Sequence, residues 1–188
     1  MRDLQYRGMH MAGGTQSGPN RSLRKRLALA SVVATAGALI TAGALPAHAS
    51  ATSCHGLPAT IVGDGSEPIV GTSGDDVIVG TSGDDEIRAG GGNDTVCGGP
   101  GNDTIYGGPG NDYLSGQLGD DKILGQLGND TILGNDGRDK LAGNDGNDKI
   151  RGGQGNDRIT GGNGTDKCDG GPGTDKTVDT CESSTNIP

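Results

Sequence analysis

The stretch that decides the fold is residues 98–106, which read Gly98-Gly99-Pro100-Gly101-Asn102-Asp103-Thr104-Ile105-Tyr106. The same nine-residue phrase follows at once in residues 107–115. It recurs twelve times between Gly71 and Val178 without an inserted or deleted residue. A fixed period of this kind is typical of repeat architectures, in which each unit stacks on its neighbours. We therefore expect the rest of the chain to serve delivery or capping of the array.

The places within the phrase differ in what they tolerate. The fourth place is Gly and the sixth is Asp in all twelve copies, and the eighth is a branched aliphatic residue in ten copies before it becomes Cys168 and then Thr177. Gly at the first and fourth places lets the backbone take positive φ and approach an ion closely, so a turn is expected there. The last three residues favour a short strand, with the eighth side chain pointing inward and the seventh and ninth outward.

This phrase resembles the G-G-x-G-x-D-x-U-x nonapeptide of the RTX, or hemolysin-type, calcium-binding repeats. The resemblance covers about 108 of the 188 residues. It implies an all-β fold, a right-handed parallel β-roll with two nonapeptides per coil. In such a roll the first six residues of each phrase turn and bind calcium, and the last three form a strand.

On this roll the sixth-place aspartates stack in two columns, one along each edge. Neighbours in a column lie ~4.8 Å apart and repel one another, and Ca²⁺ relieves the repulsion because it takes six to eight oxygen ligands. An ion between each pair of stacked turns gives up to about ten ions. A run of Asx-turns on a flexible chain is the alternative, but the regular spacing argues against it. The predicted metal ligands are Asp76, Asp94, Asp112, Asp130, Asp148 and Asp166 on one edge, and Asp85, Asp103, Asp121, Asp139, Asp157 and Asp175 on the other.

The first 49 residues read as a leader and secretory signal peptide. Basic residues between Arg21 and Arg26 precede an apolar run from Leu27 to Leu45, which Pro46-Ala47-His48-Ala49 closes as an A-x-A cleavage site. The alternative is a transmembrane anchor, since the run approaches the ~20 residues that span a bilayer. Its many Ala and Gly residues and the processing site favour cleavage after Ala49. We therefore expect a secreted, extracellular protein with no membrane association after cleavage.

Three further segments follow the signal peptide. Residues 50–70 form an N-terminal cap, in which Gly65, Glu67 and Ile69 make Val62–Val70 a degenerate repeat. Glu67 departs from the Asp pattern, so a complete calcium site is not expected there. Residues 71–178 hold the twelve repeats, and residues 179–188 are predicted to be a C-terminal cap and tail.

The charge of the mature chain limits its partners. The whole-chain counts are 24 acidic and 15 basic residues, and subtracting Asp3 and the six cations of the leader leaves 23 and 9. A chain so acidic is expected to attract cations and to avoid nucleic acid and anionic membranes.

All four cysteines, Cys54, Cys97, Cys168 and Cys181, lie after the predicted cleavage site, which suits an oxidising compartment and two disulfides. On the roll that the resemblance implies, Cys97 and Cys168 lie about four coils apart, well beyond the ~7 Å Cα limit of a disulfide. Pairing Cys54 with Cys168, or either N-terminal cysteine with Cys181, would span still more coils. The expected pairs are therefore Cys54 with Cys97 and Cys168 with Cys181. Zinc is the alternative, but the spacing contains no C-x-x-C pair.

These observations favour a secreted calcium-binding repeat protein whose β-roll folds on binding Ca²⁺. An enzyme is not expected, because His55 is the one mature histidine and few residues lie outside the repeats. The alternative function is a calcium-dependent adhesin or a module that binds a cell-surface polymer. The seventh places of the even copies read Glu86, Thr104, Lys122, Lys140, Arg158 and Lys176. The four cations at the end of this series suggest that the polymer is anionic, although cations there would also balance the acidic edges.

Overall fold

The computed structural model describes residues 53–177 and 181–185. The predicted signal peptide and its cleavage site lie outside these residues, as do parts of the predicted C-terminal tail. The regular elements of the described part are all β-strands. No described segment forms a helix that is long and apolar enough to cross a membrane.

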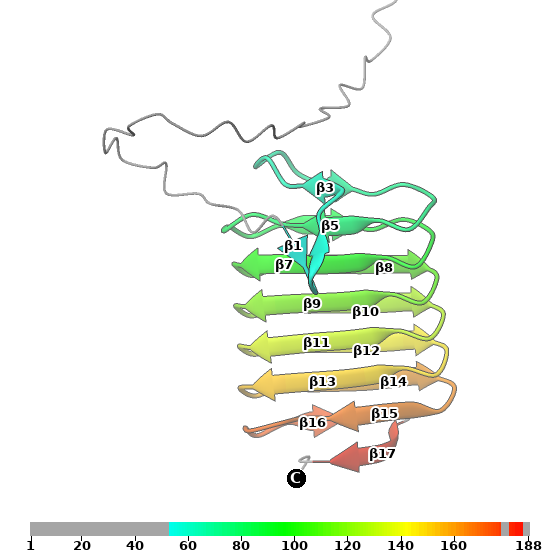
Figure 1. The fold of residues 1–188 in the computed structure, drawn as a ribbon. Helices are drawn as coiled ribbons and strands as arrows, with labels where there is room; N and C mark the ends of the chain where they lie inside the picture. The colour runs from blue at the N-terminus through cyan, green and yellow to red at the C-terminus, as the bar shows by residue number, and fades with distance from the viewer. Residues whose placement is uncertain (1–52, 178–180, 186–188) are drawn as a thin grey trace, which may run out of the picture. The chain divides into compact units, whose positions relative to one another are not determined.

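Two parallel sheets and one small hairpin contain the strands (Figure 1). The first sheet consists of β3 (Ile61–Val62), β5 (Val77–Val79), β7 (Thr95–Pro100), β9 (Tyr113–Leu118), β11 (Thr131–Asp136), β13 (Lys149–Gln154), β15 (Asp166–Asp169) and β17 (Cys181–Thr185). The second consists of β4 (Ile69–Val70), β6 (Glu86–Arg88), β8 (Thr104–Pro109), β10 (Lys122–Leu127), β12 (Lys140–Asp145), β14 (Arg158–Asn163) and β16 (Lys176–Thr177). The hairpin pairs β1 (Ser53–Cys54) with β2 (Leu57–Pro58) in antiparallel fashion.

The strand register confirms two nonapeptides per coil. Ile123 of β10 lies opposite Ile105 of β8 and Leu141 of β12, each 18 residues away. Consecutive repeats therefore alternate between the two sheets, and each sheet adds one strand per coil (Figure 1). The architecture is a parallel β-solenoid, consistent with the predicted right-handed β-roll.

The central strands are twice as long as the three residues that the phrase predicts. β10, for example, runs for six residues, from the seventh place of one repeat through the third place of the next. The strands are longer because backbone hydrogen bonds between neighbouring coils continue past the ninth place of each repeat. For example, the Gly119 N–H donates to the Asp136 carbonyl at 2.9 Å. The turn is correspondingly confined to the fourth, fifth and sixth places.

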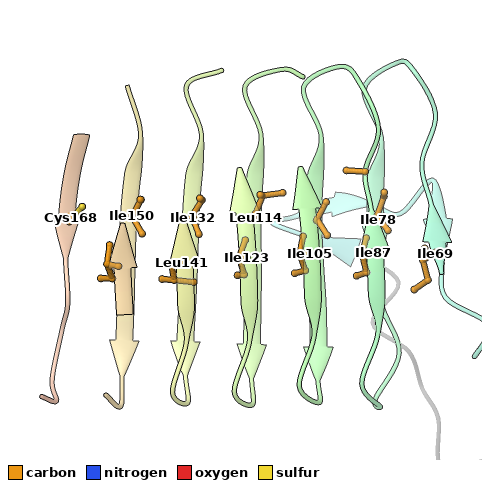
Figure 2. Packing of buried hydrophobic residues seen from close by; sticks show 13 residues of the cluster. Ile69, Ile78, Ile87, Ile105, Leu114, Ile123, Ile132, Leu141, Ile150 and Cys168 are labelled. Atoms are coloured by element: carbon orange, nitrogen blue, oxygen red, sulfur yellow. The ribbon is translucent and has the colours of Figure 1, made fainter. Parts of the chain in front are cut away.

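The core is a ladder of eighth-place side chains between the two sheets (Figure 2). The inward direction predicted for this place is confirmed, since each residue of the ladder is at most 6% exposed. Ala89 and the ladder together make up one continuous cluster; the ladder comprises Ile69, Ile78, Ile87, Val96, Ile105, Leu114, Ile123, Ile132, Leu141, Ile150, Ile159 and Cys168. Thr177, in the last eighth place, is only half-buried.

The N-terminal cap contributes more strands than the degenerate repeat predicts. Ile69 pairs with Ile87, as its register in the sequence suggests. Ile61 adds a further strand residue to the other sheet, opposite Ile78, although it precedes that residue by 17 positions instead of 18. A one-residue deletion at this place hides the relation from a strict nine-residue count.

Both predicted disulfides are confirmed. Cys54 bonds to Cys97 with their Cα atoms 5.7 Å apart, and Cys168 bonds to Cys181 with a Cα separation of 5.8 Å. The first disulfide buries the outward-facing side chains of Val79 and Cys97 in a small second cluster with Cys54. These two ninth-place residues are therefore covered, in contrast to the exposed face that the alternation predicts.

Candidate metal sites

The turns place all twelve sixth-place aspartates in two buried columns. Asp76 is 8% exposed, and the other eleven are 4% exposed or less. Within a column each carboxylate is joined to the preceding coil. The Asp103 N–H donates to Oδ1 of Asp121, and the Asp121 N–H donates to Oδ1 of Asp139, both at 2.8 Å. Ten such bonds, each between residues 18 apart, link Asp76 through Asp157 to the aspartates one coil further on.

The second oxygen of most of these carboxylates has no partner. Oδ2 is buried and accepts no hydrogen bond in Asp94, Asp103, Asp112, Asp121, Asp130, Asp139, Asp148, Asp157, Asp166 and Asp175. A buried polar atom is normally hydrogen-bonded, because losing its water without compensation is unfavourable. Ten equivalent exceptions in two regular columns therefore point to a missing positively charged partner.

An Oδ2 atom and a carbonyl oxygen lie close together beside the first-place glycine of several central repeats. A Cβ atom built on Gly134 would lie 2.1 Å from Oδ2 of Asp139 and 2.6 Å from the carbonyl oxygen of Gly152, one coil further on. Built on Gly143, it would meet Oδ2 of Asp148 at 2.0 Å and the Gly161 carbonyl at 2.6 Å. A carboxylate oxygen and a carbonyl oxygen thus border the same point. Hard oxygen donors of these two kinds are the ligands that Ca²⁺ prefers.

Asp76 and Asp85 differ from the other ten. Oδ2 of Asp76 accepts hydrogen bonds from the Thr72 backbone N–H at 2.7 Å and from the Thr72 hydroxyl at 2.8 Å. In Asp85, Oδ2 accepts from the Thr81 backbone N–H at 2.5 Å and Oδ1 accepts from the Thr81 hydroxyl at 3.0 Å. The second place is Thr in these two copies alone, so both carboxylates are satisfied from within their own turns.

Among the residues that the structure describes, no basic side chain forms an ion pair with the columns. In the described ranges, ion pairs join Arg88 to Glu86 and Arg151 to Asp169, and neither involves a sixth-place aspartate. Nor do three acidic, histidine or cysteine side chains converge on one point anywhere in the described part. An ion between two coils would therefore have to combine carboxylates from neighbouring turns with backbone carbonyl oxygens.

Burial without a counter-charge raises the carboxyl pKa values. Loss of solvent, reinforced by the neighbouring aspartates, raises the pKa of Asp103, Asp121, Asp130 and Asp139 to about 7 and that of Asp112 to about 6. The same cause raises the pKa of Asp94, Asp148 and Asp157. The backbone N–H bond to Oδ1 opposes the shift in each case but does not cancel it. Without a cation, these groups favour the protonated form.

The stability of the metal-free roll and the stability of the calcium-bound roll are expected to change in opposite directions with pH. An unfolded aspartate titrates near 3.9, so the metal-free roll binds extra protons between roughly pH 4 and 7 and loses stability as pH rises through that window. Calcium needs the deprotonated carboxylates and must displace those protons. We expect the calcium midpoint to rise as pH falls from 8 to 5. Calcium titrations at constant ionic strength, followed by circular dichroism, would measure it, and a pH-independent midpoint would refute the coupling.

Two features of the columns are not predicted by the nine-residue pattern. Fifth-place side chains form a second ladder outside the aspartates, as where the Asn111 N–H donates to Oδ1 of Asn93 at 2.8 Å and the Asn129 N–H to Oδ1 of Asn111 at 2.7 Å. The recurrence of Asn or Asp in nine of the twelve fifth places is the sequence signal for it. Glu182 ends one column, because its carboxylate accepts from the Asp166 N–H. A register shift between β15 and β17 puts Glu182 at this place, which the nine-residue count could not reveal.

Comparison with protein families agrees with this geometry. The family model of the RTX calcium-binding nonapeptide repeat matches in four copies, at residues 61–96, 70–105, 106–141 and 142–176. Together the four matches span well over half of the chain. No curated protein matches it significantly.

Proposed function

The chain belongs to the RTX calcium-binding nonapeptide repeat family, and we propose from this premise that it is a secreted protein whose β-roll folds on binding Ca²⁺ between stacked turns. The repeats indicate calcium binding by themselves. The proposal adds the ligands, the coupling to folding and the extracellular location. The protein is proposed to bind calcium and to serve a structural role, without a catalytic function.

The observation that carries the proposal is the set of ten buried Oδ2 atoms that accept no hydrogen bond. A buried carboxylate without a partner is strongly unfavourable, and a buried charge is tolerated when it is paired or coordinates a metal. Aspartates from Asp94 to Asp175 would therefore hold the ions, together with carbonyl oxygens of the adjoining turns. Calcium would supply the positive charge and the coordination demand that these oxygens lack.

The number of ions follows from the same oxygens. Ten unpartnered Oδ2 atoms correspond to the ten gaps between stacked aspartates, which supports a capacity of up to about ten ions. Asp76 and Asp85 take part as the first members of their columns, where Thr72 and Thr81 already satisfy the carboxylates. Their contribution to calcium affinity is therefore expected to be the smallest.

Secretion is supported by two independent features. The sequence of residues 1–49 has the pattern of a secretory signal peptide. All four cysteines form disulfides, which persist in oxidising compartments.

A pair of matched substitutions tests the role of the columns. Asp121→Asn keeps an oxygen that can accept from the Asp103 N–H but removes the charge at a central place, where Oδ2 has no other partner. We expect the calcium midpoint to rise about tenfold, because loss of a metal ligand costs at least as much as loss of a group that orients one. Asp76→Asn, at the end of the same kind of array, should change it by less than about twofold.

The midpoints are obtained from calcium titrations followed by circular dichroism of the two variants and the wild-type protein. Both substitutions remove one negative charge, so a general change in electrostatic attraction would affect the two alike. Equal midpoints for Asp121→Asn and Asp76→Asn would therefore overturn the stacked-site arrangement.

A further inference from the structure

Four cations form a stack on the outer face of the second sheet. Lys122 lies opposite Lys140, Lys140 opposite Arg158, and Arg158 opposite Lys176. These four residues, here called the basic ladder, are all exposed, and none of them forms an ion pair with a described residue. Like charges at the ~4.8 Å strand spacing disfavour the sheet. The packing of one coil on the next therefore does not explain why four cations stand in register.

The ladder borders two surface hollows that share Lys140 and Arg158. One hollow, of about 430 Å³, is lined by Lys140, Arg158 and Lys176 together with Arg138, Asn156 and Thr174. The other, of about 160 Å³, lies where Lys122, Lys140 and Arg158 adjoin the ninth-place side chains Leu124, Ala142 and Thr160. The exposed lining of both hollows is basic or neutral. They form a continuous basic strip along the C-terminal half of the roll.

Acidic residues in this region lie beneath the strip, at its N-terminal margin or far along the strand. Asp120 is the one at the margin: it is exposed, and its Oδ1 accepts a hydrogen bond from the Arg138 N–H at 2.9 Å. Asp139 and Asp157 line the larger hollow, but they are 0% and 2% exposed and belong to the metal columns. Asp145 is exposed, yet it ends β12 five residues beyond Lys140, ~16 Å away at the usual rise of a strand. Asp139 and Asp157 beneath the strip and Asp120 at its margin are therefore the acids that can weaken its positive potential.

The first sheet lacks an equivalent strip. Lys149 and Lys167 lie opposite one another there, but the seventh places before them are Tyr113 and Thr131. The neighbouring Arg151 has its Nε 3.8 Å from Oδ2 of Asp169. These three cations line one hollow of about 240 Å³ together with Asp169, and they offer less to a long anion than four cations in register.

We propose that the basic ladder and Arg138 bind a linear anionic polysaccharide when calcium fills the columns below them. Calcium bound by Asp139 and Asp157 would place positive charge beneath the strip, so that no buried carboxylate charge opposes a long anion there. This inference rests on the proposed calcium-binding function. A nucleic acid is disfavoured, because binding of single strands relies on stacked aromatic rings. Within residues 53–177 and 181–185, the aromatic ring found near the ladder is that of Tyr106, whose centroid lies 5.9 Å from Nζ of Lys122.

Two double variants with the same charge change test the proposal. Lys140→Gln/Arg158→Gln removes the two central cations of the ladder, and Lys149→Gln/Lys167→Gln removes the facing pair of the first sheet. Binding to dextran sulfate is measured with the calcium-loaded proteins over a series of salt concentrations. Uncharged dextran is the control for polymer contact without charge, and a poly(dT) strand is the control for nucleic acid.

The ladder variant is expected to bind dextran sulfate roughly tenfold to thirtyfold more weakly than the wild-type protein, and its log–log salt slope should fall by one to two. The first-sheet variant should bind within about twofold of the wild type. Circular dichroism of the same samples reports calcium-dependent folding separately, so a failure of the calcium sites is distinguished from a failure of the polymer site. An equal loss in both variants, no binding by the wild type, or poly(dT) binding as tight as that of dextran sulfate would overturn the proposal.

Discussion

Chelation of calcium should abolish most of the β-sheet signal of the oxidised protein. The core has one inward aliphatic side chain per nine residues, which is too little apolar burial to offset the entropy of ordering them. The metal-free columns add ten buried carboxylate oxygens without partners. Each site filled at 100 times its dissociation constant contributes about 2.7 kcal/mol. Several such sites would match the whole net stability of an ordinary domain.

Circular dichroism in excess chelator, at pH 8 and with the disulfides intact, measures this loss. Readdition of Ca²⁺ should restore the signal, whereas Mg²⁺ should not, because it demands a smaller, near-octahedral shell and keeps its water. A full β-sheet signal in chelator would show that the coils are stable on their own.

Gly128→Ala is expected to be among the most disruptive single substitutions in the array. Gly128 has φ of +126°, and a Cβ atom there would lie 1.6 Å from the carbonyl oxygen of Gly110, one coil earlier. The strained backbone and the backbone contact together should cost roughly 2–6 kcal/mol. The expected result is a large rise in the calcium midpoint, or failure to fold at any calcium concentration, as seen by circular dichroism.

Gly83→Ala is the matched control, because it changes the same place of the phrase in another copy. The φ of Gly83 lies outside the left-handed region, and an added Cβ would have the Thr81 Oγ1 at 3.8 Å as its nearest neighbour. The Gly83 N–H is held by that hydroxyl at 3.1 Å, so the turn depends on Thr81 and less on the coil before it. Nearly wild-type folding is expected. If Gly83→Ala and Gly128→Ala were equally harmful, close stacking of the coils would not explain the fourth-place glycine.

The regular part of the array could be predicted from the sequence because every coil repeats the same residue pattern in the same local environment. Inward Ile123 and Ile132, the 18-residue register and the place of Asp121 in a column all follow from places in the phrase. The disulfides could be predicted for a related reason. On a solenoid, axial distance grows with sequence separation, so Cys97 and Cys168 are too far apart to bond.

The rest could not be predicted because it depends on contacts between unequal copies. Thr72 satisfies Asp76 within one turn, which the shared pattern of glycines and aspartates conceals. Glu182 reaches the Asp166 amide after an irregular register, 16 residues away instead of 18. The extra strand at Ile61 likewise falls one residue out of step. Each departure lies near an end of the roll, where a coil lacks one neighbour and other side chains replace it.

Equilibrium dialysis of the oxidised protein against radioactive Ca²⁺, at pH 8 and constant ionic strength, tests most directly whether the stacked aspartates hold the ions. The arrangement predicts several ions per chain, up to about ten, bound over the same calcium range in which the β-sheet signal appears. Binding of one ion or none, or saturation of the sites with no accompanying change in secondary structure, would contradict it.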